Sequence, residues 1–261
     1  MRYPLYQVDA FTDKLFSGNP AAVCPLEKWL DSGLMQNIAA ENNLSETAFF
    51  VKEGDHYHIR WMTPTSEVNL CGHATLASAF VIFNHIEKGL EKIVFHSRSG
   101  ELIVTREGDL MSLDFPANKP VPQKPPEALL KAFPVRPQEV LFKRTYLVVF
   151  SSEDEIKAMK PDIKKFLEVE THGVIITARG KSVDFVSRFF APDVGIDEDP
   201  VTGYAHTLLI PYWAEKLNKT KLQALQLSRR GGELFCVHAG NRVQISGKAV
   251  LYLKGEIELE G

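Results

Sequence analysis

Two residues that can do chemistry stand at the start of the apolar stretch "NLCGHATLASAFVIF", where Cys71 and His73 lie two positions apart. A thiol and an imidazole could act as nucleophile and base, as two metal ligands, or as part of a helix N-terminus that binds an anion. Side chains two residues apart at a helix start point in different directions, so we expect no hydrogen bond between Cys71 and His73. Covalent catalysis by Cys71 is therefore disfavoured, and a small buried residue that lines a pocket is the simpler interpretation.

The spacing of possible ligands gives no support for a metal site. His56 and His58 share one face of an expected strand, but no cysteine, histidine or aspartate group at ligand spacing joins them. The sequence also has no G-x-G-x-x-G, P-loop or G-x-S-x-G motif, so nucleotide binding and serine hydrolysis lack support. We therefore predict neither a metal nor a cofactor.

The chain contains an internal repeat. "RWMTP" at 60–64 returns as "RFFAP" at 188–192, an offset of 128 residues. "RSGEL" at 98–102 returns as "RGGEL" at 230–234, an offset of 132 residues. Matches that recur in the same order indicate a duplicated fold.

The repeat pairs the Cys71 turn with a second turn. At the offset of 128 residues, Cys71 corresponds to Asp199, and "LCGHAT" matches "EDPVTG". Both turns lead into an apolar helix, whose N-terminus offers unpaired N–H groups and a partial positive charge. Two such N-termini, facing each other across a cleft between lobes, would bind an anion, most simply a carboxylate. We therefore expect His73 and Asp199 at a functional site, with two ordinary capped helices as the alternative.

The helices expected at 72–86 and 203–217 are apolar on every side, so each must be enclosed. We predict an α+β fold of two pseudo-symmetric lobes, each a barrel-like, mostly antiparallel sheet around one central helix. The lobes are expected at 1–117 and 118–261, with a crossover of the terminal strand allowed. Pro211, inside the second helix, is expected to kink or shorten it.

Hydrophobic alternation predicts the remaining elements. A first helix is expected at 26–41, and the proline-rich segment 116–130 is expected to link the lobes. Strands are expected near 3–10, 46–51, 56–62, 91–96, 101–106 and 109–115, and then near 144–150, 173–178, 182–190, 222–228, 232–238, 241–246 and 248–258.

Two further polar residues stand where a ligand could reach them. Glu46, in "NLSETAFF", opens an apolar strand and corresponds in the repeat to Val174. A carboxylate among apolar neighbours tends to have a raised pKa, which suits a residue that shuttles a proton. The alternative, which the same sequence allows, is a solvated glutamate at the end of a strand. Asn19, after Gly18 in "LFSGNPAAV", could offer an amide to a ligand.

Composition excludes several classes of protein. The 261 residues carry a formal net charge of −3 and no Lys/Arg run, so nothing indicates nucleic-acid binding. The longest apolar run, "ATLASAFVIF", is too short to span a bilayer, and the N-terminus does not read as a signal peptide. Three widely spaced cysteines fit a reducing compartment. We expect a soluble cytoplasmic protein with no nucleic-acid or membrane partner.

Four motifs in order, "DAFTDKLFSGNPAAV", "NLSETAFF", "NLCGHATLA" and "DEDPVTGYAH", resemble those of the PhzF-like isomerases of phenazine biosynthesis, nearly from end to end. The resemblance implies the duplicated fold of diaminopimelate epimerase and proline racemase, with the active site between the lobes. It also implies a cofactor-independent proton shift on a small carboxylate-bearing molecule. A homodimer is common among such relatives.

The resemblance assigns roles residue by residue. It makes Glu46 the general acid/base, with His73 and Asp199 orienting or assisting it. Tyr204 stands where the family usually has serine, which adds bulk and a phenol and implies a different substrate. Epimerase relatives use one cysteine per lobe, so Cys71 would lack its partner. The residues expected to bind substrate are Asn19, Ser45, Gly72, Thr202, Gly203 and Tyr204.

The sequence thus predicts an isomerase that moves a proton by means of Glu46. Two alternatives stay open: a protein that binds a small carboxylate without turnover, and a racemase or epimerase relative with one cysteine. Incorporation of solvent deuterium into carbon separates the catalytic from the non-catalytic interpretation.

Overall fold

The computed structural model describes residues 1–259, apart from the side chain of Val194, and divides the chain into two compact units. Unit 1 contains residues 1–114 and the segment from Ser246 onward, and unit 2 contains residues 115–245. A simple division at 117/118 would place that last segment in unit 2. It groups with unit 1 because β18 (Ala249–Glu258) pairs antiparallel with β1 (Arg2–Ala10).

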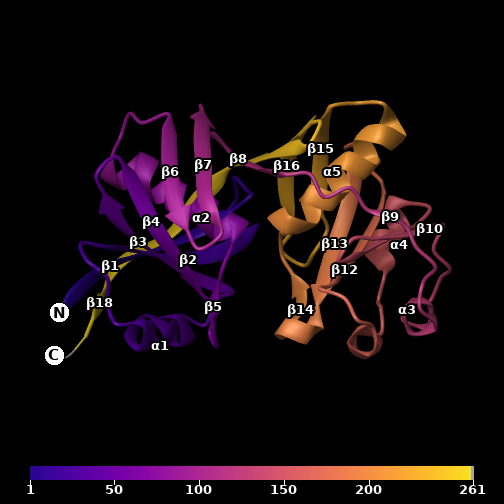
Figure 1. Cartoon of the computed structure of the whole chain (residues 1–261), viewed down its shortest axis with the longest axis horizontal. Coiled ribbons are helices and arrows are strands. Elements are labelled where there is room, and N and C mark those ends of the chain that lie inside the picture. The colour runs from indigo at the N-terminus through magenta and orange to yellow at the C-terminus, as the bar shows by residue number, and fades with distance from the viewer. Residues whose placement is uncertain (260–261) are drawn as a thin grey trace. The chain divides into compact units, whose positions relative to one another are not determined.

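Unit 1 is a mixed sheet around α2 (Gly72–Val81), with the pairing order β18–β1–β2–β3–β4–β6–β7–β8 and β5 added to β4 (Figure 1). The pairs β2–β3 and β4–β6 are parallel, and the others are antiparallel. The elements are β2 (Asn19–Leu26), α1 (Ser32–Asn42), β3 (Glu46–Glu53), β4 (His56–Met62), β5 (Glu67–Val68), a π-helical turn (Ile82–Ile86), β6 (Lys92–Ser97), β7 (Gly100–Glu107) and β8 (Leu110–Pro116).

Unit 2 repeats this arrangement around α5 (Gly203–Leu217), with the order β9–β10–β11–β12–β13–β15–β16 and β14 added to β13. The parallel pairs β11–β12 and β13–β15 match β2–β3 and β4–β6 of unit 1. The elements are β9 (Val121–Pro122), α3 (Glu127–Lys131), β10 (Glu139–Phe142), β11 (Tyr146–Val149), α4 (Glu153–Ala158), β12 (Val174–Arg179), β13 (Phe185–Ala191), β14 (Ile196–Asp199), β15 (Lys221–Gln226), β16 (Gly232–Ala239) and β17 (Arg242–Gly247), with 3-10 turns at Ile163–Glu168 and Pro192–Val194.

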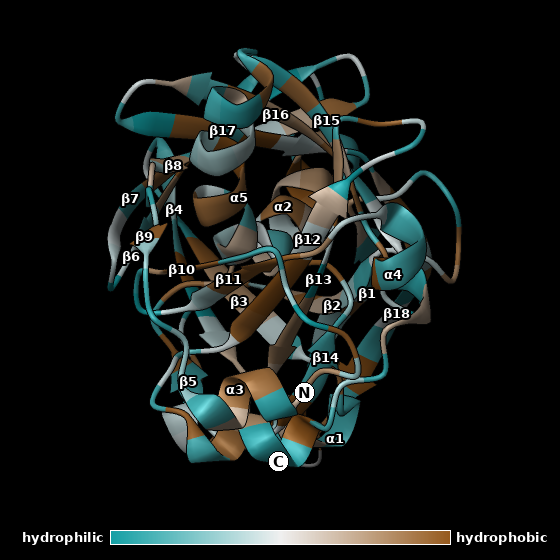
Figure 2. Ribbon diagram, turned by 90° about the vertical axis from the view of Figure 1, so that its right-hand side faces the viewer, coloured by the Kyte–Doolittle hydropathy of each residue, from teal (hydrophilic) through white to brown (hydrophobic). Residues whose placement is uncertain are grey.

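The prediction of enclosed central helices is confirmed. In α2 every residue from His73 to Val81 except Phe80 is buried, and in α5 every residue from Ala205 to Ala214 is buried. Figure 2 shows the contrast with a surface helix, because α4 is largely teal whereas α5 carries brown turns. No helix within residues 1–259 has the length and apolar character needed to cross a membrane.

Pro211 does not shorten α5, which is one of the two effects expected of it. A proline inside a helix removes the N–H that would bond to the carbonyl four residues earlier, here Thr207. That carbonyl instead accepts the backbone N–H of Asn118 at 2.9 Å, and the Asn118 amide donates to the Thr207 hydroxyl at 3.0 Å. The segment expected to be a linker therefore replaces the missing helix bond, and α5 continues to Leu217.

Several element boundaries differ from the expectation. The helix expected at 26–41 begins only at Ser32, where the Asp31 side chain caps it by accepting the Gly33 and Leu34 N–H groups at 2.8 and 3.3 Å. Residues 27–31 before it are irregular, and Leu26 is the last residue of β2, a strand that was not predicted because a proline near each of its ends hides the strand pattern. The short elements β10, α3, α4 and β14 were also not predicted, since four to six residues carry too little periodicity.

The central helices of the two units are not related by the offset of 128 residues that the sequence repeat suggested. In both units a strand arginine donates two hydrogen bonds to a glutamate of the next strand. Arg60 donates to the two carboxylate oxygens of Glu67, each at 2.8 Å. Arg188 donates to those of Glu198 at 2.7 and 2.9 Å. The offset is 128 residues at the arginines and 131 at the glutamates, because the turn at Pro192–Val194 lengthens unit 2.

This register corrects the expected partner of Cys71. Trp61 pairs with Val68 in unit 1, and its counterpart Phe189 pairs with Asp199 in unit 2, so Asp199 matches Val68. Since α2 begins at Gly72 and α5 at Gly203, Cys71 matches Thr202.

A similar correction applies to Glu46. Phe49 pairs with Arg60, and Ile176 pairs with Arg188, so these two pairs are equivalent. Counting back three residues from each places Gly173, rather than the expected Val174, at the position of Glu46.

Candidate active site

The parallel pair β2–β3 brings two of the expected residues to the start of α2. Asn19 opens β2 and Glu46 opens β3, with Ala21 aligned to Glu46 in the ladder. The Asn19 residue is fully buried, and the side chains of Glu46 and His73 are 13% and 7% exposed. Unit 1 therefore gathers Asn19, Glu46 and His73 in one nearly dry site.

His73 lies at the centre of this group. Its Nε2 atom is 3.3 Å from Glu46 Oε2, and its Nδ1 atom is 3.3 Å from the Asn19 amide nitrogen. With the Asn19 amide nitrogen as the neighbour of Nδ1, the hydrogen-bonding pattern assigns the lone pair to Nδ1 and the proton to Nε2. The protonated Nε2 then faces the Glu46 carboxylate at 3.3 Å.

Burial decides the charge of His73. Desolvation lowers the pKa of His73 from 6.5 to about 3, because an imidazolium ion would lose its hydration in this site. The 3.3 Å contact with Glu46 is then the close approach of a neutral ring to a carboxylate rather than an ion pair between two charged groups. A neutral ring at this distance adds no positive charge beside the carboxylate.

Cys71 joins the same group, contrary to the expectation that its side chain would diverge from His73. Cys71 precedes the first helical residue with an extended backbone, φ −144° and ψ 108°. Its Sγ atom lies 3.5 Å from His73 Nδ1. The expectation assumed helical geometry at both positions, and the extended backbone at Cys71 removes that assumption.

In unit 2, the start of α5 is held by a buried polar network. The Thr202 N–H donates to Gln226 Oε1 at 2.9 Å, and the Thr202 hydroxyl donates to Asp199 Oδ2 at 2.5 Å. The Gln226 amide donates to the Asp199 carbonyl at 2.8 Å and to the Thr202 hydroxyl at 3.1 Å. Gln226 is fully buried, so these bonds fix the turn before Gly203.

Sequence reasoning missed Gln226. It is the last residue of the strand "KLQALQ", and nothing in this alternating pattern indicates that its side-chain amide bonds to the turn before α5. The predicted residues Asp199 and Thr202 are therefore joined both directly and through a partner that only the fold supplies.

The other predicted residues occupy different settings. Ser45 is half-buried directly before β3, and Gly72 and Gly203 are the first residues of α2 and α5. The Tyr204 hydroxyl lies 3.1 Å from Thr145 Oγ1, and its ring meets His172 edge-on with ring centroids 5.4 Å apart. Residues of unit 2 therefore contact Tyr204 at both its hydroxyl and its ring.

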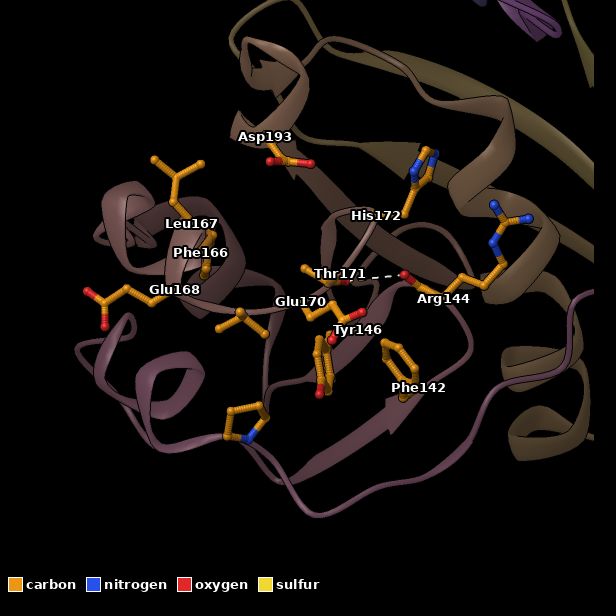
Figure 3. A pocket seen from close by; sticks show the side chains of 12 residues that line it. Phe142, Arg144, Tyr146, Phe166, Leu167, Glu168, Glu170, Thr171, His172 and Asp193 are labelled. Carbon is orange, nitrogen blue, oxygen red and sulfur yellow. Dashed lines mark hydrogen bonds between the residues drawn. The ribbon is translucent and has the colours of Figure 1, made fainter.

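A hollow of about 920 Å³ lies in unit 2, and none of the predicted site residues lines it. Figure 3 shows its lining, which includes Phe142 and Tyr146 on one side and residues 166–168 on another. Its Thr171 hydroxyl donates to the Arg144 carbonyl at 3.3 Å. Half of the lining residues are exposed, and the lining mixes acids with a single arginine, so the group around His73 is the stronger candidate for chemistry.

Comparison with known proteins identifies the family. The family described as phenazine biosynthesis-like protein (PhzC-PhzF) matches residues 8–255. The chain belongs to this family. A relative from Pseudomonas aeruginosa, named an uncharacterized isomerase, is 51% identical over 259 residues, which cover 99% of this chain and 100% of the relative.

Solved structures of the PhzF family share the fold. A PhzF-family phenazine biosynthesis protein from Enterococcus faecalis has a TM-score of 0.97 and 49% identity, covering 99% of this chain and 100% of that chain. A predicted epimerase from Pseudomonas aeruginosa has a TM-score of 0.77 at 19% identity, covering 99% of this chain and all of its own, which shows a shared fold alone. The predicted family and epimerase-like fold class are therefore confirmed.

Proposed function

We propose that this PhzF-family protein is a cofactor-independent isomerase that shifts a proton between carbons of a small carboxylate-bearing metabolite. The isomerase names of close relatives support the reaction class. Glu46 is the proposed acid/base. Its carboxylate takes a proton from one carbon, the bonding electron pair moves into the adjacent π system, and the resulting acid returns the proton to another carbon. The step is balanced without an electron acceptor, so it requires no redox cofactor.

The observation that carries the proposal is the contact between Glu46 Oε2 and His73 Nε2 at 3.3 Å in a buried setting. A general base works best when it is oriented and poorly hydrated. His73, neutral because burial lowers its pKa to about 3, orients Glu46 without competing for the substrate proton. Asn19 supports this arrangement, because its amide fixes the tautomer of His73 through the 3.3 Å contact with Nδ1.

The roles proposed for the remaining residues concern the binding of the substrate. A helix N-terminus favours a negative charge, so the starts of α2 at Gly72 and α5 at Gly203 are proposed to bind carboxylate oxygens. In unit 2, Thr202 and Asp199 would assist from the network built on Gln226. Ser45 and Tyr204 are proposed to shape the binding site, and the Tyr204 phenol would favour a substrate different from that of relatives with serine.

The test is solvent-deuterium exchange. The purified protein is first analysed by native mass spectrometry for a co-purified small acid, and that acid, with a panel of unsaturated and amino carboxylic acids, is incubated in D₂O. The proposal expects deuterium at carbon in at least one compound. Glu46→Gln should reduce the exchange rate at least about 100-fold, the range for a general acid/base, while binding remains within about threefold.

Glu53→Gln is the matched control, because Glu53 lies at the other end of β3 and is exposed. Its exchange rate should equal that of the unaltered protein. Exchange that survives in Glu46→Gln would refute the assigned mechanism. A bound acid that never exchanges would instead favour a binding protein without turnover.

A further inference from the structure

Three side chains at the start of α2 combine the three kinds of ligand that zinc sites use: the Glu46 carboxylate, the Cys71 thiol and the His73 imidazole. One ligand atom from each lies within 4.8 Å of the other two. We propose that these residues form a binding site for a thiophilic divalent cation such as Zn²⁺, and that the cation blocks the isomerase site when it binds. The blocking step rests on the proposed role of Glu46, whereas the binding step does not.

The distance between two of the ligand atoms fits tetrahedral zinc. Zn–S bonds are about 2.3 Å and Zn–N bonds about 2.0–2.1 Å, which at a tetrahedral angle separates the two ligand atoms by about 3.5 Å. Cys71 Sγ and His73 Nδ1 are 3.5 Å apart. A cation can therefore bind both atoms with little movement of the backbone, since each side chain already points toward the other.

The protonation of His73 also suits a ligand. The Nδ1 lone pair now faces the Asn19 amide at 3.3 Å, and a cation would take this lone pair in place of the amide. The Nε2 side faces Glu46, whose carboxylate would turn to become the third ligand. The fourth tetrahedral position would hold water, as in zinc sites that stay open.

The thiol ligand and the burial of the site determine which type of cation would bind. A thiol ligand binds zinc, cobalt and copper in preference to magnesium and calcium, which prefer oxygen. Cys71 and His73 are 7% and 6% exposed, so water competes poorly once the cation has entered. Cys71 also precedes the N-terminus of α2, where backbone N–H groups favour the negative thiolate.

Unit 2 lacks this set of ligands at the equivalent positions. Thr202, Tyr204 and Gly173 stand where unit 1 has Cys71, His73 and Glu46. The predicted binding is therefore one cation per chain. This asymmetry makes the cation site a property of unit 1 rather than of the duplicated fold.

A second histidine group on unit 1 must be distinguished from this site. The rings of His56 and His96 stack with centroids 4.0 Å apart and are flanked by carboxylates, with Asp55 Oδ1 3.3 Å from His56 Nδ1. A cation at that surface would bind nitrogen and oxygen only. A signal from a sulfur–metal bond therefore separates the two locations.

The binding test is a Co²⁺ titration of the purified, metal-free full chain without substrate, followed by absorbance. The proposal expects a thiolate-to-cobalt charge-transfer band in the near ultraviolet that saturates at one equivalent and that Zn²⁺ removes. Cys71→Ser should lose the band. Cys24→Ser should keep it, because Cys24 is a fully buried thiol in β2, outside the ligand group. Absence of the band, or its survival in Cys71→Ser, would overturn the proposal.

Thermal unfolding supplies a readout that does not depend on a spectrum. Zn²⁺ should raise the melting temperature of the unaltered protein, as any ligand specific for the folded state does, and should raise that of Cys71→Ser by much less. Equal shifts would place the bound cation elsewhere and refute the site. If Cys71→Ser does not fold, Cys71→Ala replaces it in both measurements.

The blocking step is tested separately in the deuterium-exchange assay. Saturating Zn²⁺ should abolish exchange, and a chelator should restore it. Cation binding with unchanged exchange would refute the blocking step. If no compound exchanges even without Zn²⁺ while the cobalt band is present, the proposed function fails and the cation site stands.

Discussion

His206 provides the sharpest test of how the buried start of α5 is held. Its side chain is fully buried in the core of unit 2, beside Phe185, and its Nδ1 atom donates to the Thr202 carbonyl at 2.8 Å. Burial lowers the pKa of His206 from 6.5 to about 4, although the bond to Thr202 acts in the opposite direction. The folded protein therefore holds His206 neutral at a pH where the unfolded chain would protonate it.

The sign and size of the effect follow from these two pKa values. Stability that His206 contributes is fully present above pH 6.5 and is lost as the pH falls toward 4, because the unfolded state binds the proton first. By proton linkage, the loss is about 2 kcal/mol at pH 5 and about 3 kcal/mol once the pH is below 4.

The measurement is urea unfolding at pH 8 and pH 5 for the unaltered protein and for His206→Gln. Glutamine does not titrate and can still donate an amide N–H toward the Thr202 carbonyl. The variant should lose about 2 kcal/mol less stability between the two pH values than the unaltered protein. Effects of other titrating groups cancel in this double difference. Equal losses in both proteins would refute the claim that His206 is held neutral by burial.

Three further outcomes are checked by urea unfolding at pH 8. Gln226→Leu should lower the free energy of unfolding by about 3 kcal/mol, because it leaves the buried N–H at the start of α5 without its acceptor; a change below about 1 kcal/mol would contradict this. Arg188→Lys should cost about 1 kcal/mol more than Arg60→Lys, because Arg188 also donates to two backbone carbonyls at 3.2 and 2.7 Å; equal costs would be inconsistent with that extra bonding. Pro211→Ala should change stability by less than about 1 kcal/mol, because the carbonyl that a helix proline leaves without a donor already has one; a gain near about 3 kcal/mol would show that the replacement bond contributes little.

The long elements could be predicted from the sequence because their patterns are strong. α5 was expected at 203–217 and spans Gly203–Leu217, and the hairpin strands β6 and β7 lie within one residue of their expected positions. Apolar residues on every side of α2 and α5 were enough to indicate that sheets enclose these helices. Periodicity over about ten or more residues carries such information, and periodicity over four to six does not.

The candidate site could be predicted in its residue types but not in its contacts. Glu46 and His73 were expected to act together, and their 3.3 Å contact fits that expectation. The contact of Cys71 with His73 was missed because it depends on one extended residue before a helix. Gln226 was missed because its bonds join positions 24 and 27 residues apart, which only the pairing of strands brings together.

The offset of 128 residues misled the comparison of the two turns for a physical reason. A repeat offset holds only while neither copy gains a residue, and the turn at Pro192–Val194 adds three between the paired arginines and glutamates. Strand register is a better guide, because a slip along a strand would exchange its buried and exposed faces. The ladder pairs Trp61 with Val68 and Phe189 with Asp199, and it thereby fixes the equivalence of Cys71 with Thr202.

The corrected register separates what the two units share from what makes unit 1 the proposed catalytic and cation-binding unit. Both units keep an arginine–glutamate pair beside the turn and a glycine as the first residue of the central helix, since both must hold a buried helix against a strand end. They differ at the three positions that carry Glu46, Cys71 and His73 in unit 1. Unit 2 has the arginine–glutamate pair and the helix glycine without these three side chains, so the two shared features form in their absence. The proposed proton transfer and cation binding at unit 1 would account for the differences, and substitution of these three residues should then alter exchange and cation binding far more than stability.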